Sequence, residues 1–303
     1  HPALSVIFFT TLSGAGYGLW FVLGLVCLAG DAPDAATTLR MLGTGFVLVS
    51  LGLLASIGHL GRPLRAWRAF SQWRSSWLSR EGVAAMLTYL PALALTAAFS
   101  GFYFSGFRLV GGLLALGAAA TVFCTARIYS SLPTIRAWHN GFVTPVYFVL
   151  ALYSGLLWLG VLGTMRMLPT VVVATVAAAL KLAYWRFVDM PTAAPTPESA
   201  TGLGTFGQVR AFERPHTEDS YLTREMGFVV ARQHARKLRR IAIALGFALP
   251  VLLALGDLLW PGTRLVFALP ALLAGSLGIF VERWLFFAEA RHTVTLYYGA
   301  PPG

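Results

Sequence analysis

Apolar residues run through this chain in eight long segments that are separated by polar or basic stretches. Each segment has about 20 residues, the length that an α-helix needs to cross the hydrocarbon core of a bilayer. Continuous apolar runs lack the alternation of barrel strands, so the pattern predicts spanning helices. The predicted spans are residues 5–29, 41–60, 82–101, 109–130, 143–163, 168–188, 241–260 and 265–288.

We therefore expect an all-α integral membrane protein with about eight transmembrane helices, arranged as two four-helix bundles within a single transmembrane domain, residues 1–303. The composition agrees, because 57% of residues are hydrophobic and only 12% are charged, against about 25% charged in soluble domains. The first apolar run, 4–30, is longer than a signal-peptide core of about 7–15 residues. We interpret it as the first span.

The basic residues are distributed unequally between the predicted loops. Of 23 Lys and Arg, 15 lie in the loops after the second, fourth and sixth spans and in the C-terminal tail, and four lie in the other loops. The positive-inside rule then predicts that both termini and the basic loops are cytoplasmic. The net charge of +11 does not indicate a nucleic-acid partner, since these residues flank apolar segments.

Two basic loops are long enough to bind a partner protein. Residues 61–81 contain five Arg and three Trp, and residues 189–240 form the longest loop of the chain. We expect both to be cytoplasmic docking loops. The stretch 222–240 is expected to be helical and to continue into the seventh span.

Cysteine and histidine usage argues against a metal or haem centre in this protein. Cys27 and Cys124 are far apart within apolar runs, whereas an iron–sulfur cluster needs about four thiolates and a structural zinc about four ligands. No histidine lies in the middle of a predicted span. We expect two buried free thiols, no haem and no iron–sulfur cluster.

The clearest chemistry lies between the second and third spans. His59 ends one predicted span and Glu81 precedes the next, so both side chains should lie at the same membrane surface. Imidazole and carboxylate exchange protons, which the two-electron, two-proton chemistry of quinones requires. Arg62 and Arg80 are placed to keep the carboxylate ionised or to bind lipid phosphate. Spacing alone leaves both a proton-active pair and simple helix-end anchoring open.

Other polar residues lie inside or near the spans. Ser13 and Tyr17 belong to a stretch of small residues that lets a helix or a flat ligand approach closely. Arg127 and Tyr129 end the fourth span at the level of Glu81. Charges inside a membrane are costly, so a second set of residues should each have a pairing partner, or their cations should extend to the surface. That set is Lys181, Glu282 and Arg283.

Several motifs resemble the membrane anchor subunit of dimethyl sulfoxide reductase. They are HPALSVIFFT at the N-terminus, SGAGYG from Ser13, GHLGRP from Gly58, AWRAF from Ala66 and SSWLSRE from Ser75. RAWHN from Arg136 and YLTREMGF from Tyr221 are similar to the branch that includes the anchor of the membrane-bound sulfite dehydrogenase.

The resemblance implies a complex of three subunits on the bacterial inner (cytoplasmic) membrane. A catalytic subunit would carry molybdopterin, a second subunit iron–sulfur clusters, and the anchor would exchange electrons with ubiquinone or menaquinone. In that family a His at the end of the second span and a Glu at the start of the third are implicated in quinol binding, which implies these roles for His59 and Glu81. Further quinone contacts are assigned by position to Ser13, Tyr17, Arg62, Arg80, Arg127 and Tyr129.

The orientation favours the cytoplasm-facing branch, which oxidises sulfite and reduces quinone. The alternative is an anchor of the dimethyl sulfoxide reductase type that oxidises quinol. Two hypotheses of a different class are a purely structural anchor and a transporter. A transporter would carry its polar groups near the midplane, whereas here they gather at one surface.

Overall fold

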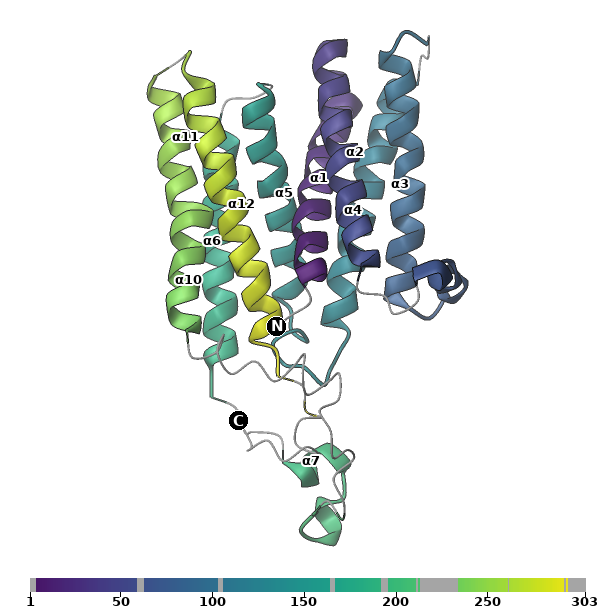
Figure 1. Cartoon of the computed structure of the whole chain (residues 1–303), viewed down its shortest axis with the longest axis vertical. Helices are drawn as coiled ribbons and strands as arrows, with labels where there is room; N and C mark the ends of the chain where they lie inside the picture. Colours follow the sequence, from purple (N-terminus) through teal and green to yellow (C-terminus); the bar gives the residue numbers. More distant parts are fainter. Residues whose placement is uncertain are drawn as a thin grey trace.

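The long apolar segments form helices that run side by side (Figure 1). The computed structural model describes residues 4–58, 63–102, 106–163, 167–191, 196–210, 212, 234–260, 262–291 and 293. Within these residues, eight helices are long and apolar enough to cross a membrane. The predicted all-α membrane fold with eight spans is confirmed.

Seven spans are single helices, and the remaining one is composite. The single helices are α1 (Leu4–Ala29), α2 (Ala35–Ile57), α3 (Trp77–Phe99), α4 (Phe107–Ser130), α5 (Val143–Leu162), α6 (Leu168–Asp189) and α12 (Arg264–Ala288). The seventh span joins α10 (Ala235–Ile243), a π-helical turn η3 (Ala244–Ala248) and α11 (Leu249–Leu259). Shorter elements are η1 (Pro63–Gln72), α7 (Pro197–Thr201) and η2 (Gly204–Phe206).

Three spans begin five or six residues earlier than predicted, because their first turns are polar. The Asp34 side chain accepts a hydrogen bond from the Thr37 amide at the start of α2, and the Ser76 side chain accepts one from the Ser79 amide at the start of α3. Such caps satisfy amides that the helix leaves free. Helix α3 therefore begins inside the predicted loop 61–81, and Glu81 lies inside α3. Helix α10 begins inside the predicted loop 189–240, in the stretch that was expected to be helical and to continue into the seventh span.

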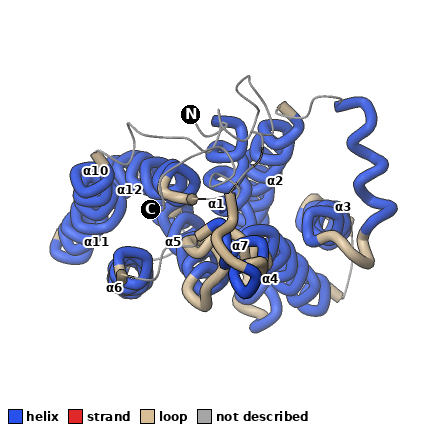
Figure 2. The backbone as a smooth tube through the Cα atoms, turned by 90° about the horizontal axis from the view of Figure 1, so that it is seen from below, coloured by secondary structure: helices blue, strands red, loops and turns tan. Residues whose placement is uncertain are grey.

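Helix α1 lies near the middle of the molecule and packs against α2, α4 and α5 (Figure 2). Its contact with α5 is a backbone contact, because a Cβ atom at Gly18 would overlap the carbonyl of Ala151. Small residues allow such close approach in membranes. On either side of this centre, α3 packs on α4, and α6 packs on α5 and α11. Since α1 joins both halves, the grouping into two four-helix bundles stays a prediction.

The basic segments gather at one end of the helices. Helices α2, α4 and α6 end there, at the end where η1 and α7 also lie (Figure 1). The opposite end carries the connections α1–α2, α3–α4, α5–α6 and α11–α12. This arrangement places Glu81, near the start of α3, at the same end as η1.

Candidate functional site

Glu81 is buried against α4 near the start of α3. Its side chain is 5% exposed, and the Thr125 hydroxyl hydrogen-bonds to its carboxylate. The same hydroxyl lies 3.0 Å from the Thr121 carbonyl oxygen. When the Glu81 carboxylate is ionised, the Thr125 hydroxyl donates to it. When Glu81 is protonated, its carboxyl can donate to Thr125, and the Thr125 hydroxyl then donates to the Thr121 carbonyl oxygen. Both protonation states of Glu81 therefore have a hydrogen-bonding partner.

Thr125 borders a small polar cavity of about 20 Å³ between α1, α4, α5 and α12. This volume accommodates about one water molecule. The polar groups in its lining include the hydroxyls of Thr10, Ser13, Tyr17, Thr125 and Tyr147 and the Arg283 guanidinium, and the rest of the lining is mostly apolar, with Val122, Leu150 and Ile279. Within the part of the chain that the structure describes, the buried hydroxyls of Tyr17 and Tyr147 have no hydrogen-bonding partner. Because unpaired buried hydroxyls are costly, this cavity is suited to binding a polar group.

Ser13 and Tyr17 are the two predicted site residues that face this cavity. The Ser13 hydroxyl donates to the Phe9 carbonyl oxygen at 2.6 Å, so its proton is already used within α1. The Tyr17 ring packs at 6.1 Å from the Trp20 ring. Within the described residues, the hydroxyls of Tyr17 and Thr11 are therefore the donors from α1 that remain for a ligand.

Arg80 contacts backbone carbonyls near the start of α3, and its assignment as a quinone contact stays a prediction. The Arg80 guanidinium donates to the carbonyl oxygens of Trp73 at 3.0 Å and Arg74 at 2.6 Å. It also lies 4.3 Å from the Trp77 ring centroid. Arg80 thus closes the turn that leads into α3, because backbone carbonyls before a helix are good acceptors for its forked donors.

Arg127 and Tyr129 lie beside the cavity and not in its lining. The Arg127 guanidinium lies 5.2 Å from the Trp77 ring, on the same indole that Arg80 contacts. The Tyr129 ring stacks on Tyr147 with a centroid distance of 5.9 Å. Tyr129 therefore supports a residue that does line the cavity. His59 and Arg62 lie outside the described residues, and their assignment stays a prediction.

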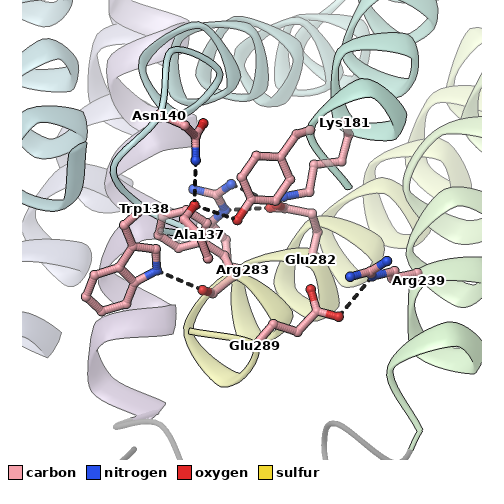
Figure 3. Close-up of polar contacts among 10 residues, drawn as sticks. Ala137, Trp138, Asn140, Lys181, Arg239, Glu282, Arg283 and Glu289 are labelled. Carbon is pink, nitrogen blue, oxygen red and sulfur yellow. Dashed lines mark hydrogen bonds and ion pairs between the residues drawn. The ribbon is translucent and has the colours of Figure 1, made fainter. Parts of the chain in front are cut away.

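A buried charge cluster adjoins the cavity on the side of α6 and α12 (Figure 3). Glu282 forms an ion pair with Lys181 at 2.5 Å and accepts hydrogen bonds from Arg283 at 2.5 and 2.8 Å. The ion pairs confirm the prediction that these residues have partners. All three residues are at most 2% exposed, so the alternative prediction, that Lys181 and Arg283 extend to the surface, was wrong. Arg283 lies 4.4 Å from the Tyr147 ring, and the three-residue cluster has two cations to one carboxylate.

A second ion-pair group connects this region to the helix ends. Arg239 of α10 donates to Glu289 at 2.9 Å and to Asp189 at 2.6 Å. Burial raises the pKa of the Glu289 carboxyl above its ordinary value, against the opposing charge of Arg239. The Trp138 indole also donates to the Phe286 carbonyl oxygen at 3.0 Å. These contacts fix the end of α12, and with it the position of Arg283.

Comparison with known proteins identifies the family. The model of the DMSO reductase anchor subunit (DmsC) matches residues 1–288. The chain belongs to the DMSO reductase anchor subunit family. It is 31% identical to the C subunit of the sulfite dehydrogenase of Allochromatium vinosum, and the match spans 98% of both proteins. It is 25% identical to the C chain of the anaerobic dimethyl sulfoxide reductase of Escherichia coli, over 65% of this protein and 73% of that one. The resemblance noted in the sequence is confirmed.

Several residues of the site in this anchor were missed by the sequence analysis. Thr125, Tyr147 and Arg283 come from three different helices and meet at the cavity. A signal was present for α4, because Thr121 and Thr125 are one helical turn apart within an apolar span. Tyr147 carried no comparable signal, since tyrosines are common near the ends of spans.

The described part of the anchor has no group of three or more His, Cys, Asp or Glu side chains that could hold a metal ion. Cys27 and Cys124 are free and buried.

Proposed function

We propose that this chain is the quinone-reactive subunit of a molybdenum oxidoreductase complex, in which it passes electrons between an iron–sulfur partner and the quinone pool. The observation that carries the proposal is the buried Glu81 carboxylate, hydrogen-bonded to Thr125 beside a polar cavity with two unpaired tyrosine hydroxyls. A purely structural anchor does not require a protonatable group at this position. An ionisable group is costly to bury in a membrane, so its presence there supports a functional role.

The proposed chemistry reduces a quinone to a quinol with two electrons and two protons. The iron–sulfur partner supplies the electrons. Glu81 supplies a proton through the Thr125 hydroxyl and the cavity, and it regains one from the aqueous side near the start of α3. In the opposite direction Glu81 accepts the proton that quinol oxidation releases. The resemblance adds His59 as a second proton donor.

Sulfite oxidation with quinone reduction is the favoured direction. The matched subunit of the sulfite dehydrogenase aligns over 98% of both lengths, whereas the dimethyl sulfoxide reductase relatives of Haemophilus influenzae and Escherichia coli match 50% to 65% of this protein. An anchor of the dimethyl sulfoxide reductase type that oxidises quinol is the second proposal, because the family model carries that name.

Isolation of the complex through a tag on this anchor tests the proposal. We expect two partner subunits with molybdenum and iron, and sulfite-dependent reduction of a ubiquinone or menaquinone analogue. The partner pair released from the anchor should keep its activity with a soluble dye and lose its activity with quinone. Equal quinone reduction with and without the anchor would contradict a quinone-reactive role.

The partner is expected to dock on the end that carries η1 and α7. Aromatic side chains are widely exposed there: Trp67 is 66% exposed and Phe206 88% exposed. Arg and Trp dominate the energetics of protein interfaces.

A reporter fused at Gly204 should be cytoplasmic and one fused at Asp34 should lie on the other side of the membrane. The reverse result would overturn the predicted orientation.

A further inference from the structure

An apolar groove runs along the membrane-facing side of the molecule, between α4 and α6. Its volume is about 450 Å³, which lies within the range of about 300–1,000 Å³ typical of ligand pockets. Helix α5 contributes the largest share of the lining, and α1 lies against its inner side. The walls include Phe21 of α1, Ala119 and Val122 of α4, Phe148 of α5 and Val176 of α6.

The groove adjoins the polar cavity. Both are lined by Tyr17, Val122 and Ala151, so the boundary between them is formed by these three residues. Tyr17 is 2% exposed, and its hydroxyl is unpaired within the described residues. The combined site thus has a long apolar part and one polar end, which matches a ligand with a polar head and an apolar tail.

The groove extends from near the surface toward the middle of the spans. Pro145, at one end, is two residues from the start of α5 at Val143. Ala119 lies eleven residues before the end of α4 at Ser130, or about 16 Å at 1.5 Å per residue. Val176 lies thirteen residues before the end of α6 at Asp189, or about 20 Å. The apolar part is therefore long enough to hold several units of a hydrocarbon tail.

We propose that this groove binds the isoprenoid tail of the quinone, with the ring directed to Tyr17 and the polar cavity. The proposal rests on the proposed function and adds to it a binding site for the quinone tail, which that function leaves open. It gives the quinone a route from the lipid: the tail lies between α4 and α6, and a ring oxygen meets the Tyr17 hydroxyl. The cavity and Thr125 then connect the ring to Glu81.

The small residues of the groove walls provide the test. Ala119→Phe and Val176→Phe fill the groove from opposite walls at its inner end. The control is Leu116→Phe, also on α4, where the side chain is 65% exposed and lies outside the groove lining. In the purified complex we compare the KM of a quinone with an isoprenoid tail and that of a tail-less quinone with the same ring.

Each groove variant should raise the KM of the tailed quinone by roughly tenfold, because apolar contacts are lost, and leave the tail-less quinone within about twofold. Leu116→Phe should change neither. Tyr17→Phe should raise the KM of both quinones, since it removes the donor at the ring. Ala119→Val gives a smaller change in the same direction and serves if the larger side chains prevent assembly, which the yield of partner subunits that co-purify with the tagged anchor reports.

An unchanged KM of the tailed quinone in the groove variants would overturn the proposal and assign the groove to a lipid acyl tail. An equal rise for both quinones would also overturn it, because the tail would then not be the part displaced. If the unaltered complex reduces neither quinone, the proposed function itself fails. The two failures are therefore distinguishable.

Discussion

Glu81→Gln is expected to lower quinone-linked turnover of the complex by about 100-fold or more, the range for loss of a general acid–base group. Glutamine keeps the size of the side chain and a hydrogen bond with Thr125, but it cannot release or accept a proton. Activity with a soluble dye at the catalytic subunit should be unchanged, because that reaction bypasses the anchor. Steady-state kinetics with both acceptors measure the difference.

Asp257→Asn is the matched control for this substitution. Asp257 is also a buried carboxylate, 9% exposed, in the last turn of α11, and this helix ends at the opposite end of the bundle (Figure 1). We expect normal quinone turnover in this variant. Full quinone turnover in the assembled Glu81→Gln complex would instead leave Glu81 with a structural role and move the proton exchange elsewhere.

Glu282→Gln is expected to destabilise the anchor by about 3–5 kcal/mol, the cost of removing one partner from a buried ion pair. The substitution leaves Lys181 and Arg283 as two buried cations without the carboxylate that both contact. The expected results are a low yield of assembled complex and a lower unfolding temperature in detergent. Thermal unfolding of each variant, extracted from membranes into detergent, measures the effect.

Lys181→Met provides the comparison that isolates electrostatics. It removes one cation and leaves the neutral pair of Glu282 with Arg283, held by two hydrogen bonds. This variant should therefore be clearly more stable than Glu282→Gln, although it removes a side chain that is equally buried. Equal destabilisation by the two substitutions would show that packing, and not charge balance, dominates at this cluster.

The sequence by itself determined the class of the fold and the number of spans. Helix-length apolar runs need no tertiary information, because a bilayer requires every backbone polar group to be satisfied within the segment. It also predicted that Lys181, Glu282 and Arg283 would need partners, since an isolated charge in a membrane is too costly; the structure showed that they pair with one another. Helix starts were less accurate: Asp34 and Ser76 cap turns whose polar residues an apolar pattern does not include.

Only the tertiary structure decided which groups meet around Glu81. A span that is apolar on all sides does not indicate which of its faces lies inside. The rotation of α4 and α5 about their axes, set by packing contacts such as Gly18 against Ala151, brings Thr125 and Tyr147 to one cavity. The same packing directs Arg80 to backbone carbonyls and forms the groove between α4 and α6. These features depend on contacts between residues distant in sequence, so no local pattern encodes them.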